Sequence, residues 1–190
     1  YDVIRPLVVG GVDLSPLYRQ IQNPDAVILD VGCGTGTALR YLDRFQSYTG
    51  MDVDPVAVQH ARSRYASANV SFSAQICTPE DVRRVAPSDV VLAGVMHHLN
   101  DDEVVGLLRS FLESRRLAQV LTADIVFLPR HPVGNLLARL DRGRFCRSEK
   151  GYLELVAQAG LTVRSRFIVR SRPRTGLGKY QYLTLVPPGA

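Results

Sequence analysis

The stretch LDVGCGTGTALRYL, residues 29–42, is the feature that most restricts the fold of this chain. An apolar run ends at Asp30, three glycines follow at alternate positions from Gly32 to Gly36, and a helical pattern begins directly after them. Glycines at such a point let the backbone approach a ligand closely while N–H groups at the start of a helix stay available. A dinucleotide site has the pattern G-x-G-x-x-G, whose last glycine would fall on Thr37. The spacing therefore argues against a standard NAD site.

Strand and helix patterns alternate along the rest of the chain. Runs typical of strands cover residues 26–30, 47–53, 70–76, 89–93, 118–126, 161–172 and 179–186. Helical patterns cover residues 37–45, 55–67, 79–85, the residues after the predicted N-cap Asn100, and 148–159. Such units join parallel strands by right-handed crossovers, whereas the short link between the last two strands predicts a hairpin. We therefore predict a single domain over residues 1–190 with an α/β, Rossmann-like fold. Its doubly wound, mixed sheet has seven strands, one of the last two antiparallel, and helices on both faces.

Two segments fall outside this alternation. Residues 1–23 precede the first strand, and residues 129–148 are inserted between the fifth strand and the last helix. Open α/β sheets bind ligands beyond the carboxyl ends of their strands, and we expect both segments to cover that edge. The insertion contains His131 and Arg144, which are our candidates for substrate contacts.

The net charge of +5 is distributed unevenly. Residues 1–110 carry 9 basic and 13 acidic side chains, whereas residues 111–190 carry 14 basic and 5 acidic ones. Four basic residues recur at even spacing along the sixth strand and are expected to share one face at the sheet edge: Arg164, Arg166, Arg170 and Arg172. Five others lie in or beside the insertion: Arg139, Arg142, Arg144, Arg147 and Lys150. The second group predicts attraction of an acidic or phosphorylated molecule or of nucleic acid, and a solvated basic surface is the alternative.

The three cysteines at positions 33, 77 and 146 are widely separated. They match neither metal-ligand spacing nor a disulfide framework, so we expect no metal and favour a reducing, cytoplasmic setting. No apolar run approaches the roughly 20 residues of a membrane span, so no membrane partner is expected.

Several motifs, in order, resemble those of class I S-adenosylmethionine-dependent methyltransferases. ILDVGCGTG, residues 28–36, resembles the first motif, in which the acidic residue, here Asp30, lies near the methionine amine of the cofactor. YTGMDVDP resembles the second motif, in which an acidic residue accepts hydrogen bonds from both ribose hydroxyls. Asp52 takes that place, with Asp54 as the alternative, and we prefer Asp52 because a helix already begins at Pro55.

The resemblance extends through the next strands. VSFSAQICTPEDV resembles the segment that contacts adenine, often through an aspartate, and Cys77 stands at that position here, so apolar or backbone contacts are expected. DVVLAGVMHHLNDDE resembles the fourth-strand motif that borders the methionine end, and RSEKGYLELVAQAGLTV resembles the helix before the sixth strand. The family also often places an N-terminal lid over the cofactor, which implies a contact from Tyr18, although PLYRQI also reads as an ordinary amphipathic helix. The residues implied to bind S-adenosylmethionine and its product S-adenosylhomocysteine are Asp30, Gly32, Cys33, Gly34, Gly36, Asp52, Val53, Ile76, Cys77, Ala93, Gly94, Val95 and Tyr18.

His97 and His98 are the candidate catalytic residues. The sulfonium methyl is already activated, so a protein contributes mainly by positioning the acceptor and, where needed, by removing its proton. A histidine has a pKa of about 6.5, which suits proton removal at neutral pH. A packing or capping role is the alternative. Cys33, a thiol at a helix start, is interpreted as a small packing residue because no second motif supports covalent catalysis.

Three functions remain open at this point. We favour a methyltransferase for a small organic acceptor, by O- or C-methylation, because VMHH stands where nucleic-acid N-methylating enzymes carry a tetrapeptide resembling Asn-Pro-Pro-Tyr. An RNA methyltransferase that uses the basic second half is disfavoured, since aromatic residues that stack on bases are few. The third is a non-catalytic or repurposed protein that binds the same cofactor.

Overall fold

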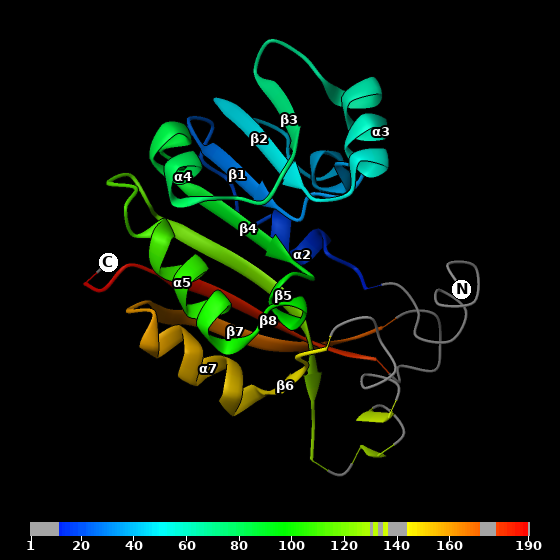
Figure 1. Ribbon diagram of the computed structural model, residues 1–190, viewed down its shortest axis with the longest axis vertical. Coiled ribbons are helices and arrows are strands. Elements are labelled where there is room, and N and C mark those ends of the chain that lie inside the picture. The colour runs from blue at the N-terminus through cyan, green and yellow to red at the C-terminus, as the bar shows by residue number, and fades with distance from the viewer. Residues whose placement is uncertain (1–11, 130, 133–134, 137–143, 172–177, 190) are drawn as a thin grey trace.

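The computed structural model describes residues 12–129, 131–132, 135–136, 144–171 and 178–189 (Figure 1). Its strands are β1 Val27–Val31, β2 Ser47–Asp52, β3 Val70–Ala74, β4 Asp89–Ala93, β5 Gln119–Phe127, β6 Arg147–Ser148, β7 Thr162–Arg170 and β8 Lys179–Val186. Its helices are α2 Ser15–Tyr18, η1 Thr37–Arg40, α3 Pro55–Tyr65, α4 Pro79–Val85, η2 Met96–His98, α5 Asp101–Phe111 and α7 Glu149–Gln158, where η denotes a 3₁₀ helix.

The sheet has the strand order β3-β2-β1-β4-β5-β8-β7. Strands β1 to β5 run parallel, and β8 runs antiparallel to both β5 and β7. The predicted mixed, seven-stranded α/β sheet is therefore confirmed, with β8 as the antiparallel member of the final hairpin. The two-residue strand β6, which pairs with the end of β5, is an addition that the sequence did not predict.

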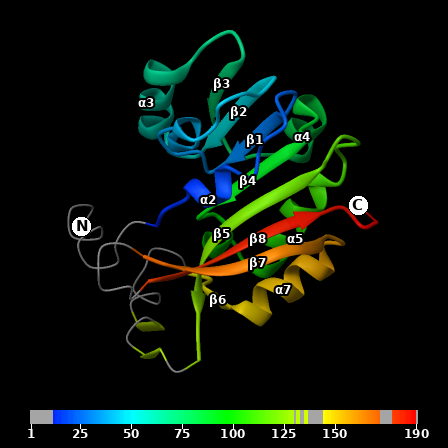
Figure 2. The same ribbon diagram turned by 180° about the vertical axis from the view of Figure 1, so that it is seen from behind.

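Helices cover both faces of this sheet (Figures 1 and 2). One hydrophobic core cluster lies under α4, α5 and α7, and the other lies under α2, η1 and α3. Residues of β1 and β4 are buried on both faces, which explains why these strands read as continuous apolar runs. The site at the carboxyl ends of the strands thus stands on a rigid, two-sided core. None of the helices in the described ranges combines the length and apolar character that crossing a bilayer requires.

The predicted helix over residues 37–45 was wrong in length. Only the four residues of η1 are helical, and the chain then runs without regular structure to β2. The chain after the glycine turn must run back along the length of β1 before β2 begins, which is a distance of about 16 Å for five strand residues. Nine α-helical residues would extend only about 13 Å. The segment must therefore stretch, and a 3₁₀ turn followed by extended chain covers more distance per residue.

The even spacing of the arginines in β7 predicted that they share one face of the strand. The structure shows that they do not all do so. The strand does lie at the sheet edge, but its pairing with β8 is irregular between Val163 and Ser165, so Arg164 is an extra residue in the ladder. A bulged residue interrupts the alternation of side chains. Arg166, beyond the bulge, pairs with Glu149 of α7 at 3.3 Å. Arg172 lies outside the described residues.

Candidate functional site

The glycine turn after β1 is held against the ends of two neighbouring strands. Gly32, Gly34 and Gly36 have φ values of +76°, +52° and +74°, which is the left-handed region that favours glycine. The N–H groups of Gly32 and Cys33 both donate to the carbonyl of Met51 in β2, at 2.7 and 3.1 Å. A Cβ atom on Gly32 would lie 2.4 Å from a methyl of Val95, just after β4. The turn therefore needs a bare backbone to fit between β2 and β4.

Asp52, the last residue of β2, holds the turn through its carboxylate. Oδ2 accepts the N–H of Gly34 at 2.8 Å, and Oδ1 accepts the N–H of Asp54 at 2.9 Å. Asp54 instead caps α3, because its carboxylate accepts the N–H groups of Val56 and Ala57. This division of roles favours Asp52 over Asp54 for binding ribose hydroxyls, since each oxygen of Asp52 keeps a further lone pair.

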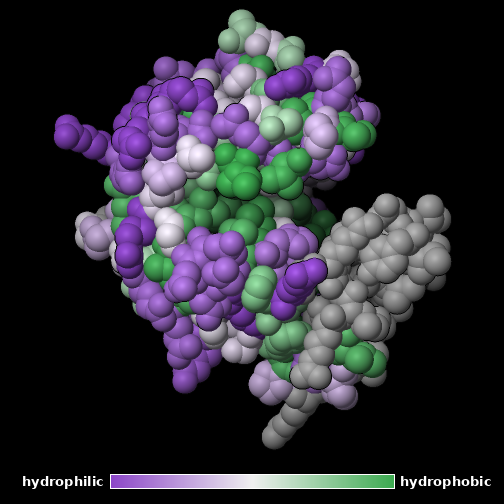
Figure 3. All heavy atoms as spheres, in the orientation of Figure 1, coloured by the Kyte–Doolittle hydropathy of each residue, from purple (hydrophilic) through white to green (hydrophobic). Residues whose placement is uncertain are grey.

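Apolar side chains are exposed beside Asp52. Val53 and Ile76 follow β2 and β3 and are 70% and 73% exposed, which is unusual for large aliphatic residues. Apolar side chains also gather in a hollow at the level of β4 (Figure 3). The Cys77 side chain instead packs in the core under α4, and burial raises the pKa of its thiol to about 12. Only the backbone of Cys77 is thus placed for the adenine contact that the sequence implied.

Asp30 is buried on the α2 side of the glycine turn. Its Oδ2 accepts the hydroxyl hydrogen of Tyr48 at 2.5 Å. Burial raises the pKa of Asp30 from 3.8 to about 7, the Tyr48 hydrogen bond lowers it, and the charge of Asp52 raises it. Tyr18 of α2 is buried nearby and stacks on Tyr41 with ring centroids 5.8 Å apart. Burial and the charge of Asp30 raise the pKa of Tyr18, so its hydroxyl stays protonated.

Cys33, between the first two glycines, is buried. Burial, followed by the charges of Asp30 and Asp52, raises the pKa of its thiol. A thiolate nucleophile is disfavoured in this setting, which agrees with the packing role that the sequence indicated.

These residues fit the expected methyl donor. With the donor bound, Asp52 would accept hydrogen bonds from ribose hydroxyls, and the exposed Val53 and Ile76 would offer apolar surface to adenine. A Cβ on Gly34 would meet no atom within 4 Å, so open space lies beside this part of the turn. Asp30, which the sequence implied to lie near the amine end, is itself buried and bonded to Tyr48. The residues at the ends of β2 and β3 therefore fit the adenosine part of the donor.

His97 lies next to this site and is tied to β5. Its Nδ1 is 2.8 Å from Oδ1 of Asp124, and the same oxygen accepts the His97 backbone N–H at 3.2 Å. Both side chains are almost fully buried. A Cβ on Gly94, at the end of β4, would lie 3.7 Å from Cε1 of His97. The imidazole is thus held in one orientation behind residues 93–95, which the sequence implied to border the methionine end.

His98 differs from His97 although the two rings are neighbours. The ring centroids are 4.2 Å apart, but His98 is exposed. A buried histidine with a carboxylate partner is the more common form of a catalytic base. The two candidates are therefore separated by burial, which the sequence alone left open.

Polar atoms beside Asp124 are buried and, within the described part of the chain, make no hydrogen bond. They are Oδ2 of Asp124, Oγ1 of Thr122 and both amide atoms of Gln181, and Nε2 of His97 is buried with them. Asp124 and Gln181 face each other across the β5–β8 ladder, and Thr122 lies two residues before Asp124 on the same face. Each such atom costs about 1–3 kcal/mol when unsatisfied, so ordered water or another polar group is expected to occupy this cluster.

The candidates in the insertion are only partly placed. His131 and Arg144 are both exposed. Phe145, next to Arg144, does donate its N–H to the carbonyl of His97 at 3.0 Å. Arg139 and Arg142 lie outside the described residues, as do residues 1–11 of the predicted lid.

Arg147 has a structural role that the sequence did not predict. Its guanidinium donates to the carbonyls of Met96 and Leu99 at 2.8 and 2.7 Å and pairs with Asp101. The side chain is 9% exposed. Arg147 therefore joins β6 to the segment around His97, and it does not attract a ligand from solvent. Lys150, from the same predicted group, pairs with Glu154 at 3.5 Å.

Asp124 is the functional candidate that sequence reasoning missed. A signal was present, because Asp124 is the only charged residue within the apolar run 118–126. A buried acid in a central strand normally has a partner or a function. Its partner could not be read from the sequence, since His97 is 27 residues away.

The comparisons with known proteins agree with this geometry. Residues 28–116 match a family model described as a methyltransferase domain. The uncharacterized methyltransferase YodH of Bacillus subtilis is 35% identical over 68 residues, which are 34% of this chain and 29% of YodH. The match therefore spans less than a third of this relative.

Solved methyltransferases share the fold. The complex between the Haloferax volcanii Trm112 methyltransferase activator and the protein named as its putative methyltransferase gives a TM-score of 0.72 at 16% identity, over 100% of this chain and 94% of the other. The magnesium protoporphyrin IX methyltransferase of Synechocystis PCC 6803, solved with bound S-adenosylmethionine, has a TM-score of 0.63 at 15% identity, over 92% and 76%. Four observations indicate a methyltransferase fold with a site for S-adenosylmethionine: the glycine turn, the acid at the end of β2, the family match and the shared fold. The chain therefore has the fold of the class I S-adenosylmethionine-dependent methyltransferases, and residues 28–116 match their methyltransferase-domain family.

Proposed function

We propose that this protein transfers the methyl group of S-adenosylmethionine to an oxygen or carbon atom of a small organic acceptor, with His97 as the general base. The observation that carries the proposal is the buried His97–Asp124 pair beside the glycine turn. When bound, the cofactor supplies a methyl group already activated by its sulfonium. The residues of this chain then have to hold the acceptor in line and accept its proton.

The pair fits a base because each partner has a defined task. An ionised carboxylate only accepts hydrogen bonds, so Asp124 favours the tautomer with the hydrogen on Nδ1 of His97. Nε2 is then the basic nitrogen. Nε2 is buried in this structure, so the proposal requires the bound acceptor to reach that atom, which would take the acceptor's proton as the methyl group is transferred and the S–CH₃ bond breaks. General bases of this kind contribute roughly 10²–10⁴-fold to a rate.

A small acceptor is supported by the protein surface near the site. Arg147, Arg166 and Lys150 are paired with Asp101, Glu149 and Glu154, so part of the basic excess is neutralised within the fold. The sequence VMHH after β4 supports O- or C-methylation over methylation of a base nitrogen. If the exposed Arg144 contributes to binding, the acceptor carries an acidic group that pairs with its guanidinium. The cytoplasmic setting is likewise a proposal, and it rests on the spacing of the three cysteines.

The decisive experiment incubates the protein with isotope-labelled S-adenosylmethionine and a metabolite extract, and identifies the labelled product. His97→Gln should lower product formation about 100-fold or more, while His98→Gln should stay within about threefold. A calorimetric titration should show that both variants still bind the cofactor. Full activity in His97→Gln would rule out the assigned base. Cofactor binding without transfer to any extract component would favour a repurposed binding protein.

An RNA methyltransferase is the second candidate, favoured by the basic second half of the chain and by the fold shared with a Trm112-bound methyltransferase. Labelling of total RNA should then occur at low salt and decline steeply as salt is raised. Absence of labelled RNA at low salt would remove this candidate.

A further inference from the structure

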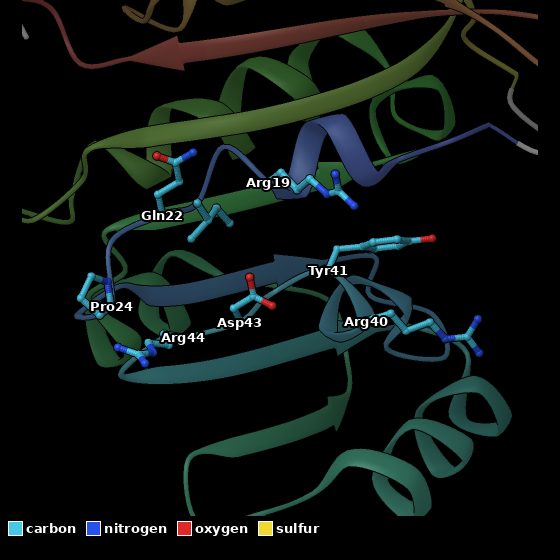
Figure 4. A pocket seen from close by; sticks show the side chains of 8 residues that line it. Arg19, Gln22, Pro24, Arg40, Tyr41, Asp43 and Arg44 are labelled. Atoms are coloured by element: carbon cyan, nitrogen blue, oxygen red, sulfur yellow. The ribbon is translucent and has the colours of Figure 1, made fainter.

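A groove lined by arginines lies away from the methyl-donor site. One wall is the segment that leaves α2, with Arg19, Ile21 and Gln22, and the other is the segment that follows η1, with Tyr41 and Arg44 (Figure 4). The groove has a volume of about 680 Å³, which is in the range of small-molecule sites. It contains none of the residues of the glycine turn, nor Asp52, Val53 or Ile76.

One wall of the groove follows the short helix η1. Residues 41–46 form no helix, and Tyr41, Asp43 and Arg44 of this segment line the groove. The walls are nevertheless fixed. Tyr41 stacks on the buried Tyr18, Leu42 is buried in the core, and the N–H of Gln46 donates to the carbonyl of Ala26 at 2.9 Å. A preformed site needs less ordering when a ligand binds.

The charges of the groove are arranged along its length. Figure 4 shows Arg44 at one end, Arg19 with Arg40 at the other, and Asp43 between them. Arg40 donates to the Tyr65 hydroxyl at 3.3 Å. Within the described ranges, neither Arg19 nor Arg44 forms an ion pair, whereas Arg83, Arg84 and Arg147 all do. Two guanidinium groups are therefore available at opposite ends, and each matches a phosphate or carboxylate group.

Asp43 decides which kind of anion fits. A carboxylate in the middle of the groove repels a chain that is negative throughout, such as a nucleic-acid strand with a charge every ~3.4 Å. It accepts hydrogen bonds from hydroxyl or amino groups. Ile21 and Tyr41 add apolar surface on the two walls. The complementary ligand has an anionic group at each end and hydrogen-bond donors in between.

We propose that this groove binds a small organic molecule with an anionic group at each end, such as a polyhydroxylated bisphosphate, as a second ligand of the protein. The site is independent of methyl transfer, and its occupancy can be measured without S-adenosylmethionine. Failure of one proposal therefore leaves the other intact.

The test is a calorimetric titration of the full chain with fructose 1,6-bisphosphate, ribose 5-phosphate and inorganic phosphate as probes. The bisphosphate should bind about tenfold or more tightly than either probe with one anionic group. Arg19→Gln and Arg44→Gln should each weaken the bisphosphate about tenfold. The double variant Arg164→Gln/Arg170→Gln, which removes two exposed arginines from β7, is the matched control and should bind as the wild type does. Circular dichroism and thermal unfolding verify that every variant is folded.

Asp43→Asn separates charge from hydrogen bonding. The variant should bind inorganic phosphate more tightly than the wild type does, because a repelling charge is removed. The ratio of the affinities for the bisphosphate and for inorganic phosphate should fall. Equal affinities for all three probes, or equal losses in the β7 control, would overturn the proposal. Oligouridylate that displaces the bisphosphate and binds more tightly in the wild type would also overturn it, and would identify the groove as a nucleic-acid contact.

Discussion

Nδ1 of His97 lies 2.8 Å from Oδ1 of Asp124, across 27 residues of sequence. The contact joins η2, directly after β4, to the middle of the carboxyl-terminal half of β5. Because the carboxylate also accepts the His97 backbone N–H, both the ring and its peptide unit are fixed by one side chain. The orientation of the His97 ring is thereby set by β5.

Asp124→Asn should slow methyl transfer about 10–100-fold without loss of cofactor binding. An asparagine amide can donate to Nδ1, which favours the tautomer whose hydrogen is on Nε2 and so blocks the base. The measurement is the rate with the identified acceptor, beside a calorimetric titration with S-adenosylmethionine. Asp89→Asn is the control, since Asp89 is also buried but bonds Ser88 and Gln119 at the start of β4. An unchanged rate in Asp124→Asn would show that the orientation of His97 does not matter.

Asp52→Ala should weaken S-adenosylmethionine binding by about 10–100-fold, because two ribose hydroxyls lose a charged acceptor. Asp54→Ala removes the N-cap of α3, so it should cost about 1 kcal/mol of unfolding free energy while cofactor affinity stays within about threefold. Calorimetry and urea unfolding measure the two effects separately. Equal losses of affinity in both variants would contradict the assignment of Asp52.

Gly32→Ala should destabilise the protein by about 2–4 kcal/mol. The variant combines a left-handed backbone with a Cβ placed 2.4 Å from Val95. Adding Val95→Ala should recover only the part due to crowding, leaving about 1–2 kcal/mol of backbone strain. Gly34→Ala has no neighbour within 4 Å, so its cost should be the strain alone. Denaturant unfolding of the wild type, the two single glycine variants and the double variant measures these free energies. Full recovery of the unfolding free energy in the double variant would show that the left-handed backbone adds no strain.

The stability of the protein without ligand should fall as pH rises from about 4 to about 7. Burial raises the pKa of Asp30 from 3.8 to about 7, so the native state holds this proton more tightly than the unfolded chain does within that window. The decline should be on the order of a few kcal/mol. It should vanish in Asp30→Asn.

Tyr48→Phe sharpens this test of Asp30. The Tyr48 hydrogen bond lowers the pKa of Asp30, so its removal should extend the decline to higher pH. Urea unfolding at several pH values measures the free energy of unfolding for all three proteins. The same slope in wild type and Asp30→Asn would assign the decline to other groups.

Gln181→Leu should leave stability unchanged or raise it by about 1–2 kcal/mol. Both amide atoms of Gln181 are buried without a hydrogen bond among the described residues, and an apolar side chain of similar size removes that cost. Thermal unfolding shows whether the substitution raises or lowers the stability of the protein. A loss of more than about 1 kcal/mol would mean that the amide is satisfied by ordered water inside the protein.

The methyl-donor half of the site was predictable because its signals are local. A left-handed turn favours glycine. An acidic residue at the end of a strand lies at the edge of the sheet where ligands bind. An N-cap favours Asp or Asn two or three residues ahead of the N–H groups that it accepts. The positions of Asp52 and Asp54, and the capping box of Asn100 with Glu103, all follow from such short-range rules. The parallel order of β1 to β5 follows from the alternation of strands and helices.

The remaining features were decided by the tertiary structure. The pairing of His97 with Asp124, the anchoring role of Arg147 and the groove between α2 and η1 each join segments that strand order alone brings together. The length of η1 was set by the distance back along β1, which no local pattern reports. By itself, the sequence determined the glycine turn proposed to receive the methyl donor, because that turn is built from residues in succession. The His97–Asp124 pair proposed to act on the acceptor was decided only when distant strands came to lie side by side, because a side chain gains its partner from packing and not from its neighbours in the chain.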